Sequence, residues 1–136
     1  MRLIGFNFKK ISIEKLKNTF KDLKINTKIN IEDVSIVEEN FIKKDQSVVK
    51  VDFIYSVEYN PEIANIELKG QLILALPSDQ SKELINGWKD KKMKEDYRIA
   101  IFNVIYKKSN VKSLELEEDM DLPLHIPFPT LKKQQK

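Results

Sequence analysis

The most reactive side chains lie near the C-terminus, where one histidine follows a run of carboxylates. His125 is the single histidine of the chain and sits among prolines in LPLHIPFP, so it has no second imidazole with which to share a metal ion. The acidic run at 115–121 could attract a hard cation, but it has neither the spacing nor the glycine of a calcium-binding loop. We predict no metal site, a structurally incidental His125, and a solvated linker at 115–121.

The sequence has none of the usual motifs for nucleotide binding or for covalent catalysis. The glycines, Gly5, Gly70 and Gly87, are too far apart for a dinucleotide fingerprint or a P-loop, both of which crowd backbone amides around phosphate. No G-x-S-x-G nucleophile motif occurs, and the chain has no cysteine, which excludes disulfides and thiolate metal ligands. The sequence therefore predicts neither an enzyme nor a cofactor.

The most basic stretch is WKDKKMKEDYR at 88–98, where lysines and an arginine lie between two aromatic residues. Such residues can contact phosphates while their rings stack on bases. Three acids, Asp90, Glu95 and Asp96, interrupt the stretch, and 24 basic against 21 acidic residues give the chain a net charge of only +3. We interpret the basic residues as a solvated connection between helices and regard nucleic-acid binding as unlikely, a third hypothesis behind those given below.

Length and composition indicate one folded domain. The chain has 136 residues, of which 41% are hydrophobic and 33% charged, within the range of ordinary globular domains. No apolar run approaches the ~20 residues that span a bilayer, and the N-terminus has no uninterrupted apolar core of a signal peptide. We expect a single domain over 1–136, no membrane contact, and a cytoplasmic location.

Two long strands are predicted by alternation of apolar and polar residues. The first covers 49–59 and ends at Asn60-Pro61, because proline cannot continue an inner strand. Alternation resumes over 66–76, close enough for a hairpin. Gly70 falls on the apolar side of this second strand, which indicates a bend or a close backbone approach.

Two earlier strands complete the predicted sheet. The apolar residues at 25–36 change parity at Glu32-Asp33, and a β-bulge there would return them to one face. Alternation at 4–8 predicts the first strand of the chain. The sequence thus predicts a four-stranded antiparallel sheet over about 2–77.

Two helices should follow over about 79–108. Ser78 or Asp79 is a suitable N-cap for a short first helix that ends near Gly87, and a second begins near Met93. The second helix has two apolar stripes, and one small sheet can cover only one of them, so we predict that the other is a subunit interface or a binding surface. The core-facing stripe is Met93, Tyr97, Ala100, Ile101, Val104 and Ile105, and the other is Ile99, Phe102 and Tyr106.

The tail at about 111–131 should be extended. Its prolines lack backbone donors and exclude a helix or an inner strand. Large apolar residues occupy every second position between the prolines, which predicts that they anchor the segment to an apolar surface of its own subunit or of a neighbour. These residues are Leu122, Leu124, Ile126 and Phe128.

This order of elements resembles the SecB family of export chaperones, most closely the SecB-like proteins of archaea and of toxin-antitoxin systems. The resemblance covers nearly the whole chain, from F-x-F-x-x-I at 6–11 to LPLHIPFP. It implies an α+β fold with a four-stranded antiparallel sheet, two C-terminal helices on one face and an extended proline-rich C-terminal segment. It also implies homodimers or homotetramers that bind unfolded or precursor polypeptides in apolar grooves, as ATP-independent holdases active in protein transport.

The chain departs from the bacterial members of that family, which are strongly acidic and carry a short tail for the SecA motor. Here the net charge is positive and the end reads LKKQQK, so docking to SecA is doubtful. The residues that we predict to bind clients or form an interface would equally be explained as ordinary core. They are Trp88, Phe102, Tyr106, Leu124, Ile126 and Phe128. The alternative hypothesis is a structural or adaptor protein that binds one specific folded partner.

Overall fold

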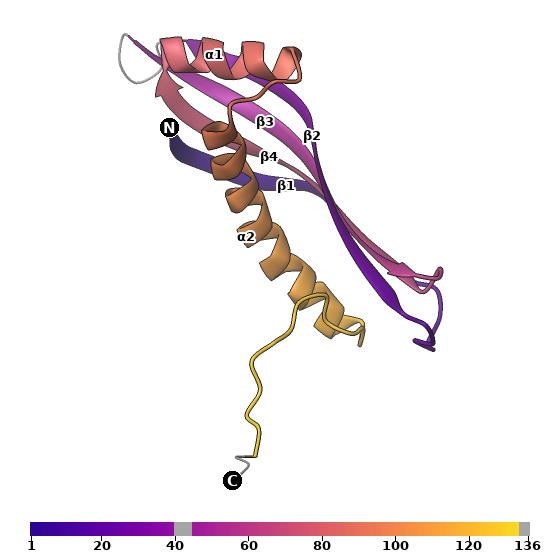
Figure 1. Ribbon diagram of the computed structural model, residues 1–136. Coiled ribbons are helices and arrows are strands. Elements are labelled where there is room, and N and C mark those ends of the chain that lie inside the picture. The colour runs from indigo at the N-terminus through magenta and orange to yellow at the C-terminus, as the bar shows by residue number, and fades with distance from the viewer. Residues whose placement is uncertain (40–44, 134–136) are drawn as a thin grey trace.

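The computed structural model describes residues 1–39 and 45–133, which form one antiparallel sheet and two helices (Figure 1). The strands are β1 (Arg2–Lys15), β2 (Lys24–Glu39), β3 (Gln46–Asn60) and β4 (Ala64–Pro77). The helices are α1 (Ser78–Lys89) and α2 (Glu95–Asp119). The sheet order is β1-β4-β3-β2, so the β3–β4 hairpin is central and β1 and β2 are the edges. The predicted α+β architecture with a four-stranded antiparallel sheet is confirmed.

The inner face of the sheet holds the core because alternate residues of the two central strands point toward the helices. In β3 the fully buried side chains include Val51, Phe53 and Tyr55, and in β4 they include Leu68 and Leu72. Their sequence neighbours on the other face are mostly polar and are partly exposed, with Ile54 and Ile73 the apolar exceptions. This is the pattern of a sheet that is covered on one side only.

The bulge predicted in β2 is present. The pairing of β2 with β3 shifts between Ile31 and Asp33, so that Ile31 lies opposite Phe53 while Val34 lies opposite Val51. Both apolar residues therefore face the core, although in a regular strand residues 31 and 34 would point to opposite faces. One extra residue in β2 keeps a long strand amphipathic.

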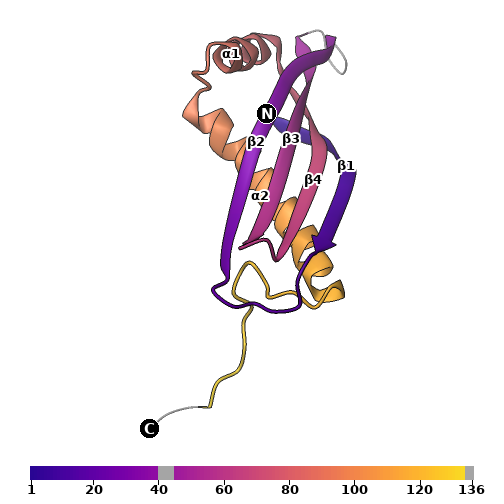
Figure 2. The same ribbon diagram turned by 90° about the vertical axis from the view of Figure 1, so that its right-hand side faces the viewer.

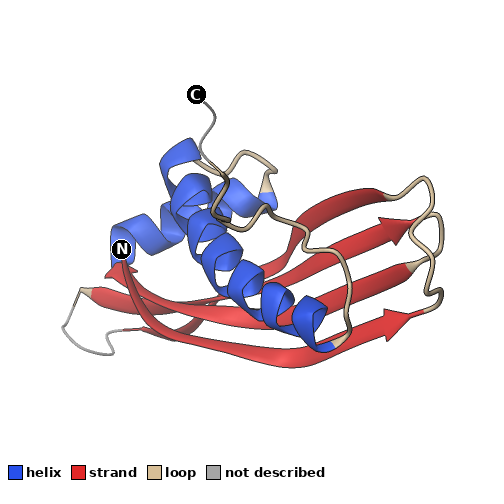
Figure 3. Ribbon diagram, turned by 90° about the horizontal axis from the view of Figure 1, so that it is seen from below, coloured by secondary structure: helices blue, strands red, loops and turns tan. Residues whose placement is uncertain are grey.

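Both helices cover the same face of the sheet (Figures 2 and 3). The short helix α1 lies over one end of the strands, and α2 runs obliquely over the middle (Figure 1). The predicted N-cap of α1 is wrong, because Pro77 holds that position without a side-chain cap, and the Ser78 hydroxyl oxygen lies 3.1 Å from that of Ser47. Among the described residues no helix has the length and apolarity to cross a membrane.

The predicted end of the second helix near 108 is wrong, since α2 continues to Asp119 and includes most of the acidic run. Every fourth residue of α2 is buried, but this row changes from apolar to polar along the helix. Its members are Tyr97, Ile101, Ile105, Ser109, Ser113 and Glu117. Apolar periodicity stops at Ile105, and the last three turns give no signal of a buried face.

The close approach expected at Gly70 is also present. A Cβ atom at Gly70 would lie 2.7 Å from the backbone oxygen of Asn7 in β1 and 2.8 Å from Cζ of Phe53. The Phe53 ring packs beside the rings of Phe6 and Phe8, with centroids 5.6 Å and 6.4 Å away. Only glycine leaves room for this aromatic group on the sheet.

We predict that Gly70→Ala lowers the free energy of unfolding by about 1–3 kcal/mol, because the added methyl overlaps backbone that cannot move independently. Gly5→Ala is the matched control, since its Cβ would lie no closer than 3.3 Å to the side chain of Ile73 and should cost less. Urea unfolding at one fixed protein concentration measures both. Equal losses for the two variants would contradict this account of Gly70.

Candidate functional site

An apolar pocket lies between edge strand β2 and the connection from α1 to α2, and we call it the β2-edge pocket. Its volume is about 390 Å³. It brings together Trp88 and Phe102, two of the residues predicted to bind clients. The lining is Ile29, Asn30, Ile31, Trp88, Lys91, Lys92, Met93, Arg98 and Phe102.

The dimensions of the elements explain why this pocket is open. Four strands at a spacing of about 4.8 Å make a sheet wider than one helix of about 10 Å diameter, and strands of 14 to 16 residues are about 50 Å long. The helices have 12 and 25 residues, or about 18 and 37 Å. They bury β3 and β4 but leave Ile29 and Ile31 of β2 half-buried.

A second pocket lies between the end of α2 and the tail, and we call it the tail pocket. It has a volume of about 410 Å³ and is lined by Leu114, Glu115, Glu118, Leu124 and Phe128. Leu124 is half-buried, whereas Phe128 is 64% exposed. Two further predicted site residues thus meet, far along the chain from the β2-edge pocket.

The remaining predicted residues lie in neither pocket. Tyr106 is 44% exposed on α2, on the same side of the helix as exposed Ile99. Ile126 is half-buried in the tail. The six residues are therefore divided among two pockets, one helix face and the tail, and they do not form one site. Ile29 and Ile31 were not predicted as site residues, because their alternation indicates only an ordinary core strand.

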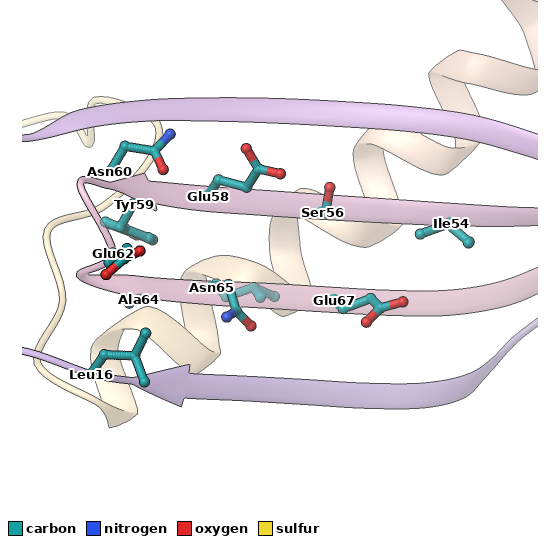
Figure 4. Close-up of a pocket in the computed structure, with 11 residues that line it drawn as sticks. Leu16, Ile54, Ser56, Glu58, Tyr59, Asn60, Glu62, Ala64, Asn65 and Glu67 are labelled. Atoms are coloured by element: carbon teal, nitrogen blue, oxygen red, sulfur yellow. The ribbon is translucent and has the colours of Figure 1, made fainter.

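A third pocket, of about 500 Å³, lies on the face of the sheet away from the helices (Figure 4). Figure 4 shows Ser56 and Glu58 on β3 beside Asn65 and Glu67 on β4. Glu58 and Glu67 already pair with Lys28 and Lys10, at 3.3 Å and 3.1 Å between nitrogen and oxygen. Such exposed ion pairs are typical of a solvated face.

A buried polar cluster connects β3, α2 and the tail. The His125 ring nitrogen Nδ1 lies 2.6 Å from Oε2 of Glu117 and 2.9 Å from Oε1, and the His125 backbone N–H also donates to Oε1. The Nε2 atom lies 3.0 Å from the Tyr55 hydroxyl and 3.1 Å from Oδ1 of Asn110. Tyr55 donates to that Asn110 oxygen at 2.6 Å. The side chains of Glu117 and His125 are only 0% and 2% exposed.

Two predictions about these residues are wrong. His125 is not incidental, and the acidic run is not a solvated linker at Glu117. The chain reverses after α2, with Asp121 at a φ of 52°, and the Leu122 N–H donates to the Glu117 carbonyl at 2.9 Å. This turn buries Leu122 in the core and returns His125 to the helix. Contacts made across a turn have no signature in residue spacing.

Burial also changes the pKa values of two tyrosines in this region. It raises the pKa of Tyr55 to about 12, and it raises the pKa of Tyr59, where the negative charge of Glu117 adds to the effect. Both phenols are therefore protonated near neutral pH and can donate hydrogen bonds. Tyr59 donates to the Pro123 carbonyl at 2.5 Å, which fixes the start of the tail to β3.

We predict that His125→Ala destabilises the protein by about 3–5 kcal/mol, because it leaves the Glu117 carboxylate buried without its partner. Denaturant unfolding at fixed protein concentration measures the loss. Faster chymotrypsin cleavage at Leu124 should accompany it, since the tail is released. Leu131→Ala, at a fully exposed tail position, is the control and should change neither quantity. A His125→Ala variant as stable as this control would contradict the described packing of the tail.

We predict that stability falls from pH 10 to about 12 partly through Tyr55. An unfolded tyrosine loses its proton near pH 10, whereas folded Tyr55 holds its proton up to about 12, so the unfolded chain binds fewer protons in that window. Tyr55→Phe should give a shallower fall, measured as the guanidinium midpoint between those pH values. Identical slopes in the variant and the parent protein would contradict the effect of burial on this phenol.

Comparison with known proteins finds a likeness in structure alone. No family model matches the chain, and no curated protein matches its sequence. Among solved structures, the chain is similar to a SecB-like chaperone of Mycobacterium tuberculosis in complex with a ChAD peptide from the HigA1 antitoxin. The TM-score is 0.52 at 10% sequence identity, and the match covers 98% of this chain and 92% of that one. The four strands, the two helices and their order therefore make a SecB-like fold.

Proposed function

We propose that this protein is an ATP-independent holdase that binds unfolded or precursor polypeptides and keeps them from aggregating. The observation that carries the proposal is the apolar β2-edge pocket on a sheet face that the helices cover incompletely. Exposed apolar patches on a folded protein are typical of binding surfaces. The SecB-like fold supports the same conclusion, since the similar mycobacterial protein is a chaperone.

The physics of this surface suits clients without a fixed sequence. Burial of apolar area stabilises a complex by about 25 cal/mol per Å² and has no directional requirement. The Trp88, Met93 and Phe102 side chains that line the pocket are large or flexible, which allows them to pack against different client residues. Such binding needs no nucleotide, because release follows from competition or from client folding.

We also propose that the protein acts as a homodimer or homotetramer. Ile99 and Tyr106 form an apolar stripe on α2 that nothing within the described part of the subunit covers, and both are close to half exposed. Edge strand β1 adds exposed Leu3 and Ile11. A second copy would bury these residues and leave the β2-edge pocket for clients.

An adaptor for one specific partner is the second candidate function. It is favoured by the mycobacterial structure, which holds a defined peptide from an antitoxin. A holdase should act on unrelated unfolded chains at near-stoichiometric amounts, whereas an adaptor should not. Light scattering of two unrelated proteins during thermal unfolding, with and without this protein and without ATP, separates the two candidates. Failure to suppress either aggregation would contradict the holdase.

We predict that Phe102→Asn together with Tyr106→Asn impairs either suppression of aggregation or oligomer formation, since both replacements remove apolar contact area from α2. Light scattering and sedimentation measure the two effects on the same samples. Val111→Asn is the control, because Val111 is 63% exposed on a different side of the helix. If the double variant retains the oligomer and the activity, the apolar stripe of α2 has neither role.

A further inference from the structure

The β2-edge pocket is more positively charged than the mixed sequence at 88–98 suggests. Three cationic side chains line it, from Lys91, Lys92 and Arg98, and its lining contains no carboxylate. The acids that alternate with them in the sequence, Asp90, Glu95 and Asp96, do not line the pocket. The fold therefore separates a mixed stretch into a positive rim around an apolar floor.

These cations are available to a ligand. All three residues are exposed, and none forms an ion pair with a carboxylate within the described ranges. Arg98 can bind a carboxylate through two parallel hydrogen bonds, and the lysines add positive charge with flexible reach. A ligand that places acids on the rim and an apolar side chain on the floor would satisfy both parts of the pocket.

The wall of the pocket is a free sheet edge. Ile29, Asn30 and Ile31 belong to β2, which pairs with β3 on one side only within the described residues. The backbone N–H and C=O groups along its other side can pair with an added strand. An extended polypeptide beside β2 would alternate its side chains between the two faces and present every second one to the pocket.

We propose that the β2-edge pocket binds extended polypeptide segments in which acidic residues lie two positions before and after a bulky apolar residue, so that all of them face the pocket. The segment adds a strand to β2, its apolar side chain contacts Trp88 and Phe102, and its carboxylates contact Lys91, Lys92 and Arg98. This inference rests on the proposed client binding and names the preferred class of client. Single-stranded nucleic acid would also meet cations and aromatic rings, but it would not use the sheet edge or the aliphatic floor of Ile29 and Ile31.

The test uses full-length protein and two short fluorescein-labelled peptides. In one peptide the positions that face the pocket carry glutamate and phenylalanine in turn, with serine at the positions between them, and in the other lysine replaces every glutamate. Fluorescence anisotropy gives both dissociation constants, and a third version of the acidic peptide, N-methylated on one edge, tests strand addition. We expect the acidic peptide to bind about tenfold or more tightly than the lysine peptide, and N-methylation to weaken it. Equal binding of the acidic and lysine peptides would overturn the proposal.

The variant is Lys91→Glu, Lys92→Glu and Arg98→Glu combined, which should reverse the preference between the two peptides. The matched control carries Lys21→Glu, Lys82→Glu and Lys107→Glu, exposed residues outside the pocket with the same change of net charge. The control should bind as the parent protein does. Equal effects of the two triple variants would overturn the proposal, because net charge alone would then explain the preference.

Two further outcomes separate this inference from others. Tighter binding of single-stranded oligothymidylate than of the acidic peptide would overturn it in favour of a nucleic-acid site. Aggregation assays on the same samples distinguish a failure of the inference about acidic peptides from a failure of the proposed holdase function. Suppression of aggregation without any acidic preference would overturn the inference alone, and selective acidic binding without suppression would support the pocket while contradicting the holdase.

Discussion

The sheet has one apolar face, and the two helices are too small to cover it. This mismatch of dimensions determines much of the rest of the structure. The inner faces of the central strands β3 and β4 lie beneath the helices and are buried, while those of the edge strands β1 and β2 are mostly half-buried or exposed. Ile11 and Leu3 on β1 are 48% and 39% exposed. Apolar surface next to unpaired backbone groups promotes aggregation of a folded protein, but it is also the surface that can bind unfolded chains.

A second constraint holds the end of α2 against the sheet, where the buried face of this helix is polar. The last turns of α2 face the sheet with Ser109, Ser113 and Glu117, which contribute little hydrophobic burial. The tail compensates by turning back, so that His125 partners the Glu117 carboxylate and Tyr59 donates to Pro123. A buried carboxylate without such partners would oppose folding. The polar cluster therefore fixes where the proline-rich tail starts and holds the end of α2 against β3.

Residue patterns predicted the parts of the fold that depend on alternation. The strands, the hairpin at Asn60-Pro61, the bulge beyond Ile31 and the close approach at Gly70 all follow from which residues can share a buried face. The patterns failed in α2 after Ile105, because a buried serine and a solvated serine look alike in a sequence. They also failed at His125, whose partners Glu117 and Tyr55 come together only through the turn after α2 and the packing of that helix on β3.

The candidate site was predictable only in part. Trp88 and Phe102 were among the residues predicted to bind clients or form an interface, and the fold brings them together. Their neighbours Ile29 and Ile31 did not stand out, since an edge strand is recognised only once the sheet order is known. Similarly, Lys91, Lys92 and Arg98 were indistinguishable from a solvated connection until the fold separated them from the adjacent acids.

Hydrogen–deuterium exchange with an unfolded client tests the central claim, that clients occupy the incompletely covered face beside β2. The account predicts slower exchange in the presence of client along β2 around 29–31 and in the segment 88–102. It predicts no change in the central strands around Ser56, Glu58 and Glu67, which already pair with a strand on each side. Protection only outside these two segments, or at neither of them in a complex that demonstrably forms, would contradict it.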